Sequence, residues 1–173
     1  MLDTLPDLLQ PGLRIVFCGT AAGTASAARG AYYAGPGNRF WPTLFATGLT
    51  PRRLRPDEFH LPQFGIGLTD VAKTVSGADA DIPAQAFDRI RLATNLRAIR
   101  PERLAFNGKK AASLFLGIPT RQLAYEPTSP LPDGPPITVL PSTSGAAAGF
   151  WDAEPWFALA REVISTVSGT AAD

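Results

Sequence analysis

The segment at residues 13–23 reads LRIVFCGTAAG, and it is the stretch that decides the fold. Its first part is apolar and β-favouring, which predicts a buried strand over residues 13–18. The strand then breaks into small, loop-forming residues. A second predicted strand, residues 137–140, breaks in the same way into residues 141–145, which read PSTSG. Because ligands bind where parallel strands end, these two loops, far apart in sequence, are expected to build one site.

The rest of the chain alternates predicted strands with predicted helices. Apolar runs predict strands over residues 64–69 and 103–106, while residues 6–11 are expected to form a short helix or turn and residues 19–37 a long loop. Helices are predicted from Asn38 as a cap to Gly48, over residues 82–100, over residues 109–116, and from Asp152 as a cap through a stripe of Trp156, Leu159, Val163 and Val167. This alternation indicates the α/β class, as a three-layer α/β/α domain with a short central, mainly parallel sheet.

Length and composition are typical of one soluble domain that spans residues 1–173. The chain is 45% hydrophobic and 18% charged, and 173 residues suffice for a full core. Cys18 is the single cysteine of the sequence, which excludes an internal disulfide and a multi-cysteine zinc site. No apolar run is long enough to span a bilayer, and the first residues lack the basic start of a secretory signal, so the expected location is the cytoplasm.

The charge balance gives no global argument for nucleic-acid binding, because the formal net charge is only +1. Basic residues do cluster within residues 52–55 and at Lys109 and Lys110, where they are either solvated or available to phosphates. The single histidine of the sequence, His60, lies in a loop-like stretch beside Pro62, which argues against a His-dependent catalytic triad.

Four short segments match, in order, the motifs of one protein family. Gly19-Thr20-Ala21-Ala22-Gly23 lies where that family has Gly-Ile-Asn-Pro-Gly after the first strand, and residues 36–41, PGNRFW, match its Pro-x-Asn-Arg-Phe-Trp segment. Residues 65–70, GIGLTD, and residues 140–145, LPSTSG, correspond to two further motifs. The chain therefore resembles the mismatch-specific uracil-DNA glycosylase and thymine-DNA glycosylase family, within the uracil-DNA glycosylase superfamily, over about residues 13–165.

The resemblance implies a monofunctional DNA repair glycosylase of uracil-DNA glycosylase-like fold. Such an enzyme hydrolyses the N-glycosidic bond of a uracil flipped out of DNA, which initiates base excision repair, and it uses no metal and no cofactor. The expected partner is DNA, as a uracil-containing or mismatched duplex or as a single strand. The expected state is a monomer without membrane association. The range of other damaged bases and the dependence on the opposite base stay open.

One departure from the family falls on its catalytic asparagine, which is replaced here by Ala21, with Ala22 in place of the following proline. Alanine can neither activate nor position a water molecule. Asp70 is the expected catalytic replacement, because it ends a predicted strand and should face the same crevice as Gly19. A carboxylate there can hold and polarise water and stabilise a sugar cation. The alternative is that Asp70 caps a helix over residues 71–74.

Three parts of the chain are expected to contact the flipped base. The backbone N–H groups of Gly19, Thr20, Ala21, Ala22 and Gly23 can meet a base oxygen, unless these residues form a plain tight turn. Tyr33 corresponds to the family's stacking ring, with Tyr32 as the neighbouring alternative, and one of the two rings could instead belong to the core. Asn38 can pair with the base edge through its amide, or cap a helix.

The DNA backbone is expected to contact the second loop and three basic side chains. These residues are Ser142, Thr143, Ser144, Gly145, Arg39, Lys109 and Lys110. The alternative for the loop is an ordinary hydroxyl-rich turn. Family members insert a bulky residue from just after this motif into the gap left by the base. Residues 146–148 are all alanine here, so Phe150 or Trp151 either takes this role or belongs to the core, and Asp79 and Asp81 are expected to be solvated.

Two other functions are compatible with the sequence. A nucleotide-binding α/β enzyme could use residues 19–23 as a phosphate loop, although the Gly-x-Gly-x-x-Gly and Gly-Lys-Ser/Thr patterns are absent. The second alternative is a DNA-damage binding module that has lost activity together with the asparagine.

Overall fold

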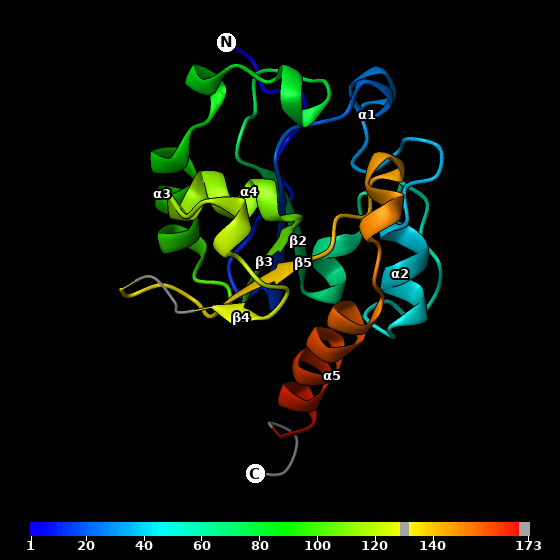
Figure 1. Ribbon diagram of the computed structural model, residues 1–173. Coiled ribbons are helices and arrows are strands. Elements are labelled where there is room, and N and C mark those ends of the chain that lie inside the picture. Colours follow the sequence, from blue (N-terminus) through cyan, green and yellow to red (C-terminus); the bar gives the residue numbers. More distant parts are fainter. Residues whose placement is uncertain (129–131, 170–173) are drawn as a thin grey trace.

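The computed structural model describes residues 1–128 and 132–169, and within them five strands form one sheet. The strands are β1 (Ile15–Gly19), β2 (Ile66–Asp70), β3 (Leu104–Asn107), β4 (Pro127–Thr128) and β5 (Ile137–Leu140), in the order β2-β1-β3-β5-β4 (Figure 1). The first four in that order run parallel, and the two-residue β4 pairs antiparallel with β5 at the edge. The mainly parallel central sheet predicted from the sequence is confirmed.

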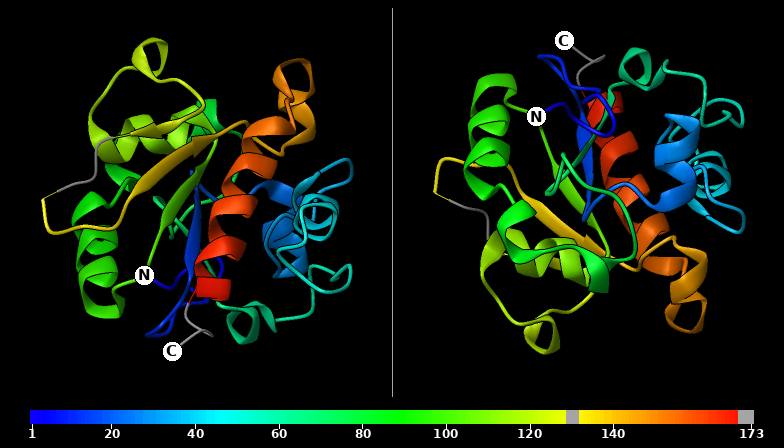
Figure 2. Two further views of the ribbon diagram at one scale, coloured as in Figure 1. Left: turned by 90° about the horizontal axis from the view of Figure 1, so that it is seen from below. Right: turned by 90° about the horizontal axis from the view of Figure 1, so that it is seen from above.

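Helices cover both faces of the sheet, which makes the predicted three layers (Figure 2). On one face lie α3 (Arg89–Ile99) and α4 (Lys109–Leu116); on the other lie α1 (Thr24–Arg29), α2 (Phe40–Ala46) and α5 (Glu154–Gly169). Alternate residues of β1 serve the two cores: Ile15 and Phe17 pack with Trp156 of α5, whereas Val16 and Cys18 pack with residues of α3 and α4. Every residue of β1 is buried, as a parallel strand covered on both faces requires.

Short 3-10 helices occupy several of the connections. They are Leu61–Phe64, Asp79–Asp81, Ala84–Ala86, Thr120–Gln122 and Gly145–Phe150. None of the helices formed by the described residues is both long and apolar enough to cross a bilayer.

The predicted bounds of residues 109–116 and 137–140 agree with α4 and β5, but the long helix predicted over residues 82–100 is wrong in its first part. Helix α3 begins at Arg89, after an extended Phe87, because the Asp88 carboxylate accepts a hydrogen bond from the backbone N of Arg91 (2.9 Å) and caps the helix there. Ile90 is 82% exposed, and the helix buries Leu92 and Leu96.

Two further local predictions need correction. Residues 19–37 are not one long loop, because α1 forms within them and ends at Gly30, whose φ of 64° is favourable only for glycine. Asn38 precedes α2 by two positions: its side-chain oxygen accepts from the backbone N of Phe40 (3.0 Å), while Arg39 is the capping position. Asp152 does accept from the backbone N of Glu154 at the start of α5 (3.0 Å); the side chain of Val167 lies outside the described residues.

The N-terminal segment is extended over residues 6–10 and turns at residues 11–12, so the helix or turn expected over residues 6–11 is present only at its end. Leu8 and Leu68 exchange two backbone hydrogen bonds (3.0 and 3.1 Å), so the segment runs antiparallel along the outer edge of β2. This contact places the side chains of residues 3–8 beside the strand that carries Asp70.

Candidate functional site

A cavity of about 650 Å³ opens at the carboxyl ends of the parallel strands. The loop after β1 and the loop after β5 both line it, together with Tyr33, Asn38 and Asp70. The segment between α1 and α2 touches the loop after β5: the backbone N of Arg39 donates to the carbonyl of Thr143 (2.9 Å), and a Cβ placed on Gly145 would lie 3.6 Å from the carbonyl oxygen of Pro36. The structure thus brings together the two segments that the sequence placed at one sheet edge.

Asp70 is the last residue of β2 and lies opposite Gly19 of β1 in the parallel register. A Cβ added to Gly19 would lie only 2.6 Å from Asp70 Oδ1, which is closer than real contacts allow. Position 19 therefore requires glycine because the carboxylate fills the space of a side chain. Asp70 is not a helix cap, since residues 71–74 form no helix.

The carboxylate of Asp70 is buried without a partner. The residue is 5% exposed and lines the cavity, and its side chain makes no hydrogen bond with another described residue. Burial raises its pKa from 3.8 to about 7; the positive charge of Lys73 lowers that pKa, and the negative charges of Asp7 and Asp79 raise it. A buried acid whose oxygens face a cavity and which titrates near neutrality is suited to hold and polarise a water molecule.

The loop after β1 presents backbone donors to the cavity. The carbonyl groups of Gly19, Thr20 and Ala22 accept hydrogen bonds from the backbone N–H groups of Val71 (3.0 Å), Ala72 (2.8 Å) and Gly77 (3.0 Å). In contrast, the N–H groups of Thr20, Ala21 and Gly23 donate none of the hydrogen bonds between described residues, whereas Ala22 is paired with Ser76 in an isolated parallel bridge. Several amide donors are thus available to an oxygen or an anion in the cavity.

Tyr33 lines the cavity in a left-handed conformation, with φ of 52°, which is uncommon for an aromatic residue. Its ring packs against Phe40, with 4.1 Å between centroids, so a base could stack only on the opposite face. Its hydroxyl is buried, has no hydrogen-bond partner among the described residues and lies 3.3 Å from the Cβ position of Gly19. Tyr32 is a core residue whose hydroxyl accepts a hydrogen bond from Lys73 (2.7 Å).

Two asparagines also line the cavity. Asn38 Oδ1 accepts one hydrogen bond from the backbone N of Phe40, and the Asn38 amide nitrogen, which makes no hydrogen bond with a described residue, is a donor at the cavity. Asn107, which no sequence motif singled out, ends β3 and holds the loop after β5 in place. Its Nδ2 donates to the hydroxyl of Thr143 and its Oδ1 accepts from the backbone N of Thr143, both at 2.9 Å. Asn107 follows the strand predicted over residues 103–106, as Asp70 follows its own predicted strand, and this position could have marked it as a cavity residue.

The serine-threonine loop is ordered by its own side chains. Thr143 is fully buried and bound to Asn107, so the direct phosphate contact expected of its side chain is not available. Ser142 Oγ accepts from the backbone N of Ser144 (3.2 Å), and Ser144 Oγ from that of Ala146 (3.3 Å). Ser142, Ser144 and Gly145 are the members of this loop that remain accessible for contacts with DNA.

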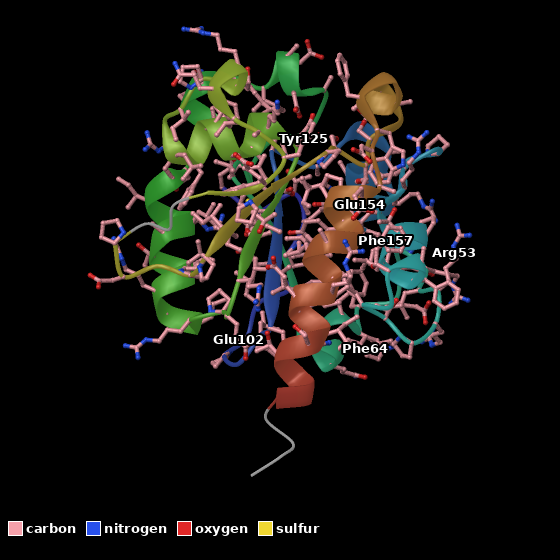
Figure 3. The ribbon with its side chains drawn as sticks, turned by 60° about the horizontal axis from the view of Figure 1, so that its bottom comes forward. Arg53, Phe64, Glu102, Tyr125, Glu154 and Phe157 are labelled. Carbon is pink, nitrogen blue, oxygen red and sulfur yellow. The ribbon has the colours of Figure 1, made fainter. Side chains whose placement is uncertain are left out.

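The basic residues differ in how far they are already engaged. The Arg39 guanidinium lies 5.5 Å from the ring centre of Trp151, and its Nη1 is buried without a hydrogen-bond partner in the described part of the chain. Lys109 Nζ lies 4.5 Å from the ring centre of Tyr125, which Figure 3 labels, in a cation–π contact. Lys110 is exposed at the rim of the cavity.

Two predictions about neighbouring residues change. Asp79 is an exposed residue, but its carboxylate accepts from the Thr20 hydroxyl (3.3 Å) and lines the cavity, and partial burial raises its pKa, so it is more than a solvated charge. Phe150 is 78% exposed at the end of the Gly145–Phe150 helix, whereas Trp151 packs against the core.

The described residues contain no cluster of three or more His, Cys, Asp or Glu side chains suited to a metal ion.

Comparison with known proteins places this architecture in a family. The solution NMR structure of a "putative Uracil DNA glycosylase" from Methanosarcina acetivorans is similar in fold, with a TM-score of 0.63 over 92% of this chain and 96% of that one at 24% sequence identity. The model of the Uracil DNA glycosylase superfamily matches residues 6–162, which include both cavity loops and Asp70. The chain therefore belongs to the uracil DNA glycosylase superfamily.

Proposed function

We propose that this protein is a monofunctional DNA glycosylase that hydrolyses the N-glycosidic bond of uracil in DNA and so initiates base excision repair. Membership of the superfamily supports a DNA glycosylase activity in general. The observation that carries the specific proposal is Asp70, a buried carboxylate without a hydrogen-bonding partner among the described residues, directed at a cavity large enough for an everted base.

The reaction separates charge between the sugar and the base. As the bond from C1′ to the base nitrogen breaks, positive charge grows on the sugar and negative charge on the pyrimidine oxygens. The ionised Asp70 holds the attacking water, accepts its proton and stabilises the sugar cation. The free N–H groups of Thr20, Ala21 and Gly23 supply donors for the departing base, as a fixed site for developing negative charge.

Other residues position the substrate. The amide nitrogen of Asn38 donates to a carbonyl oxygen of the base, and the open face of the Tyr33 ring stacks on it. Ser142, Ser144 and Lys110 contact phosphates at the cavity rim. Phe150, exposed beside three alanines, is the residue that enters the gap left by the base.

We further propose that the hydrogen-bond donors at the cavity decide which bases the protein excises. The Asn38 amide nitrogen and the backbone N–H groups after β1 are donors, which favours bases that present carbonyl oxygens, as uracil does on both sides of its ring nitrogen. We place the chain near the mismatch-specific enzymes on its sequence motifs, and we expect it to act as a monomer.

A single-turnover assay on a duplex with one uracil tests the proposal. The wild-type protein should yield abasic product, and Asp70→Ala should slow the reaction by about 10²- to 10⁴-fold while DNA binding persists. Asp57→Ala, which removes an exposed carboxylate, is the matched control and should react as wild type. Binding without abasic product by the wild-type protein would instead favour the damage-binding module. A gain in thermal stability with nucleotides alone would favour the nucleotide-binding enzyme.

A further inference from the structure

Lys73 is a lysine enclosed in the protein interior three residues after Asp70. Its side chain is 3% exposed, and its Nζ lies 2.7 Å from Asp7 Oδ1 and donates to the Tyr32 hydroxyl, also at 2.7 Å. A buried ammonium of this kind persists only when it is paired, because removal from water is costly for an isolated charge. Asp7 is its ionic partner.

Asp7 is also held by three other side chains, from β2 and α3. Its Oδ1 also accepts from the hydroxyl of Thr69 in β2 (2.8 Å), and its Oδ2 accepts from Asn95 of α3 (3.3 Å) and lies 3.6 Å from Arg91. The flanking backbone is fixed as well, since the N–H of Thr4 donates to the carbonyl of Lys73 (2.6 Å). The ion pair therefore has a defined place beside the end of β2.

This pair and Asp70 border the same space. A small crevice is lined by Asp7, Thr69, Asp70 and Lys73, together with Arg91 and Asn95. Asp70 also lines the main cavity, so it borders both that cavity and the crevice of the buried charge pair. The titratable and charged groups that face it come from the N-terminal segment, β1, the loop before α2 and the segment after β2: Asp7, Cys18, Tyr32, Tyr33, Lys73 and Asp79.

We propose that Lys73 and Asp7 are positioning residues for Asp70, which as a charge-balanced buried pair set the pH range in which its carboxylate is ionised. The proposal rests on the catalytic role given to Asp70 above. Lys73 favours the ionised carboxylate and Asp7 opposes it, so loss of one partner disturbs Asp70 more than loss of both. Neither residue lines the main cavity, so neither touches the substrate directly.

The pH dependence of the single-turnover rate on uracil-containing DNA tests the pair. Lys73→Met should move the acid limb of the profile upward by about one to two pH units, because Asp70 loses a positive neighbour and faces an unpaired Asp7. Asp7→Asn should move the limb in the opposite direction, and the double variant should return it to near the wild-type position. Lys73→Arg, which keeps the charge, should leave the limb in place.

Asp3→Asn is the control for loosening of the N-terminal segment, because Asp3 anchors that segment to Arg91 (2.6 and 2.9 Å) away from Asp70. It should leave the limb unchanged. A purely structural pair would lower the plateau of every variant and leave the limb in place, which would overturn the proposal.

The titration of the Asp70 carboxyl carbon, followed by NMR in the DNA-free protein and assigned with Asp70→Asn, separates the two proposals. If no base is excised but the carboxyl titration still shifts as described, the proposed function fails and the role of the pair stands. If excision occurs and the titration is identical in all variants, the pair has no such role.

Discussion

Replacement of Asp70 by asparagine should stabilise the protein at alkaline pH while it removes activity. Burial raises the pKa of the Asp70 carboxyl from 3.8 to about 7, so the folded state binds its proton more tightly than the unfolded chain does. For a raised acid pKa, the stability linked to the proton is fully present below about pH 4 and is lost as the pH rises through about 7. Asparagine has nearly the same shape and never ionises.

The magnitude follows from the shift. A difference of about 3 pKa units, at about 1.4 kcal/mol each, gives a cost of about 4 kcal/mol for the ionised carboxylate at pH 9. This is an upper value, because water in the cavity solvates the carboxylate in part. Urea unfolding at several pH values, followed by tryptophan fluorescence, measures the difference between wild type and Asp70→Asn.

The pH dependence of the stability gain tests whether Asp70 carries an unpaired buried charge. The stability gain of Asp70→Asn should be large at pH 9, stay large down to about pH 7 and fall away between about pH 7 and pH 4, whereas Asp57→Asn at an exposed position should show no such trend. A gain that is absent at pH 9, or one that is the same at every pH, would refute the view that an unpaired buried charge sits at this position.

Four further predictions concern the same cavity. The single-turnover rate of the wild-type enzyme should rise about tenfold per pH unit below about pH 7, as Asp70 ionises. Gly19→Ala should destabilise the fold by about 1 to 3 kcal/mol in urea unfolding and suppress excision, because its methyl group would displace the Asp70 carboxylate. Phe150→Ala should leave stability within about 0.5 kcal/mol, yet reduce excision from duplexes more than from single strands. Lys110→Ala should reduce the salt slope of DNA binding by about one, whereas Lys109→Ala should change it less, because Lys109 is held over Tyr125.

The sheet and its edge could be predicted from the sequence because buried parallel strands appear as continuous apolar runs. The run before Gly19 and the run before Pro141 end where the structure ends β1 and β5, within one residue. The identity of the cavity loops followed from these breaks and needed no knowledge of tertiary contacts. The start of α3 was mistaken because the apolar pattern of residues 82–90 resembles a helix, whereas the Asp88 cap fixes the boundary.

Long-range partners were beyond the reach of local patterns. Asn107 and Thr143 are 36 residues apart, and Arg91 and Asp3 are 88 apart, so neither contact is visible in any window of sequence. The same holds for Asp79, whose loop composition indicated only solvent exposure, and for Lys73, which lies outside the four motifs. The sequence located Asp70 at the site, but its lack of a hydrogen-bonding partner among the described residues emerged only from the structure.

The way the first residues lie along β2 has a practical consequence for recombinant work. Met1 and Leu2 point into solvent and can carry a purification tag or a fluorophore. From Asp3 to Leu8, however, the chain supplies an edge pairing and an ion pair that the interior depends on. Trimming this stretch to ease crystallisation would leave Lys73 without its counter-ion, and a shortened protein that expressed poorly would say nothing about catalysis.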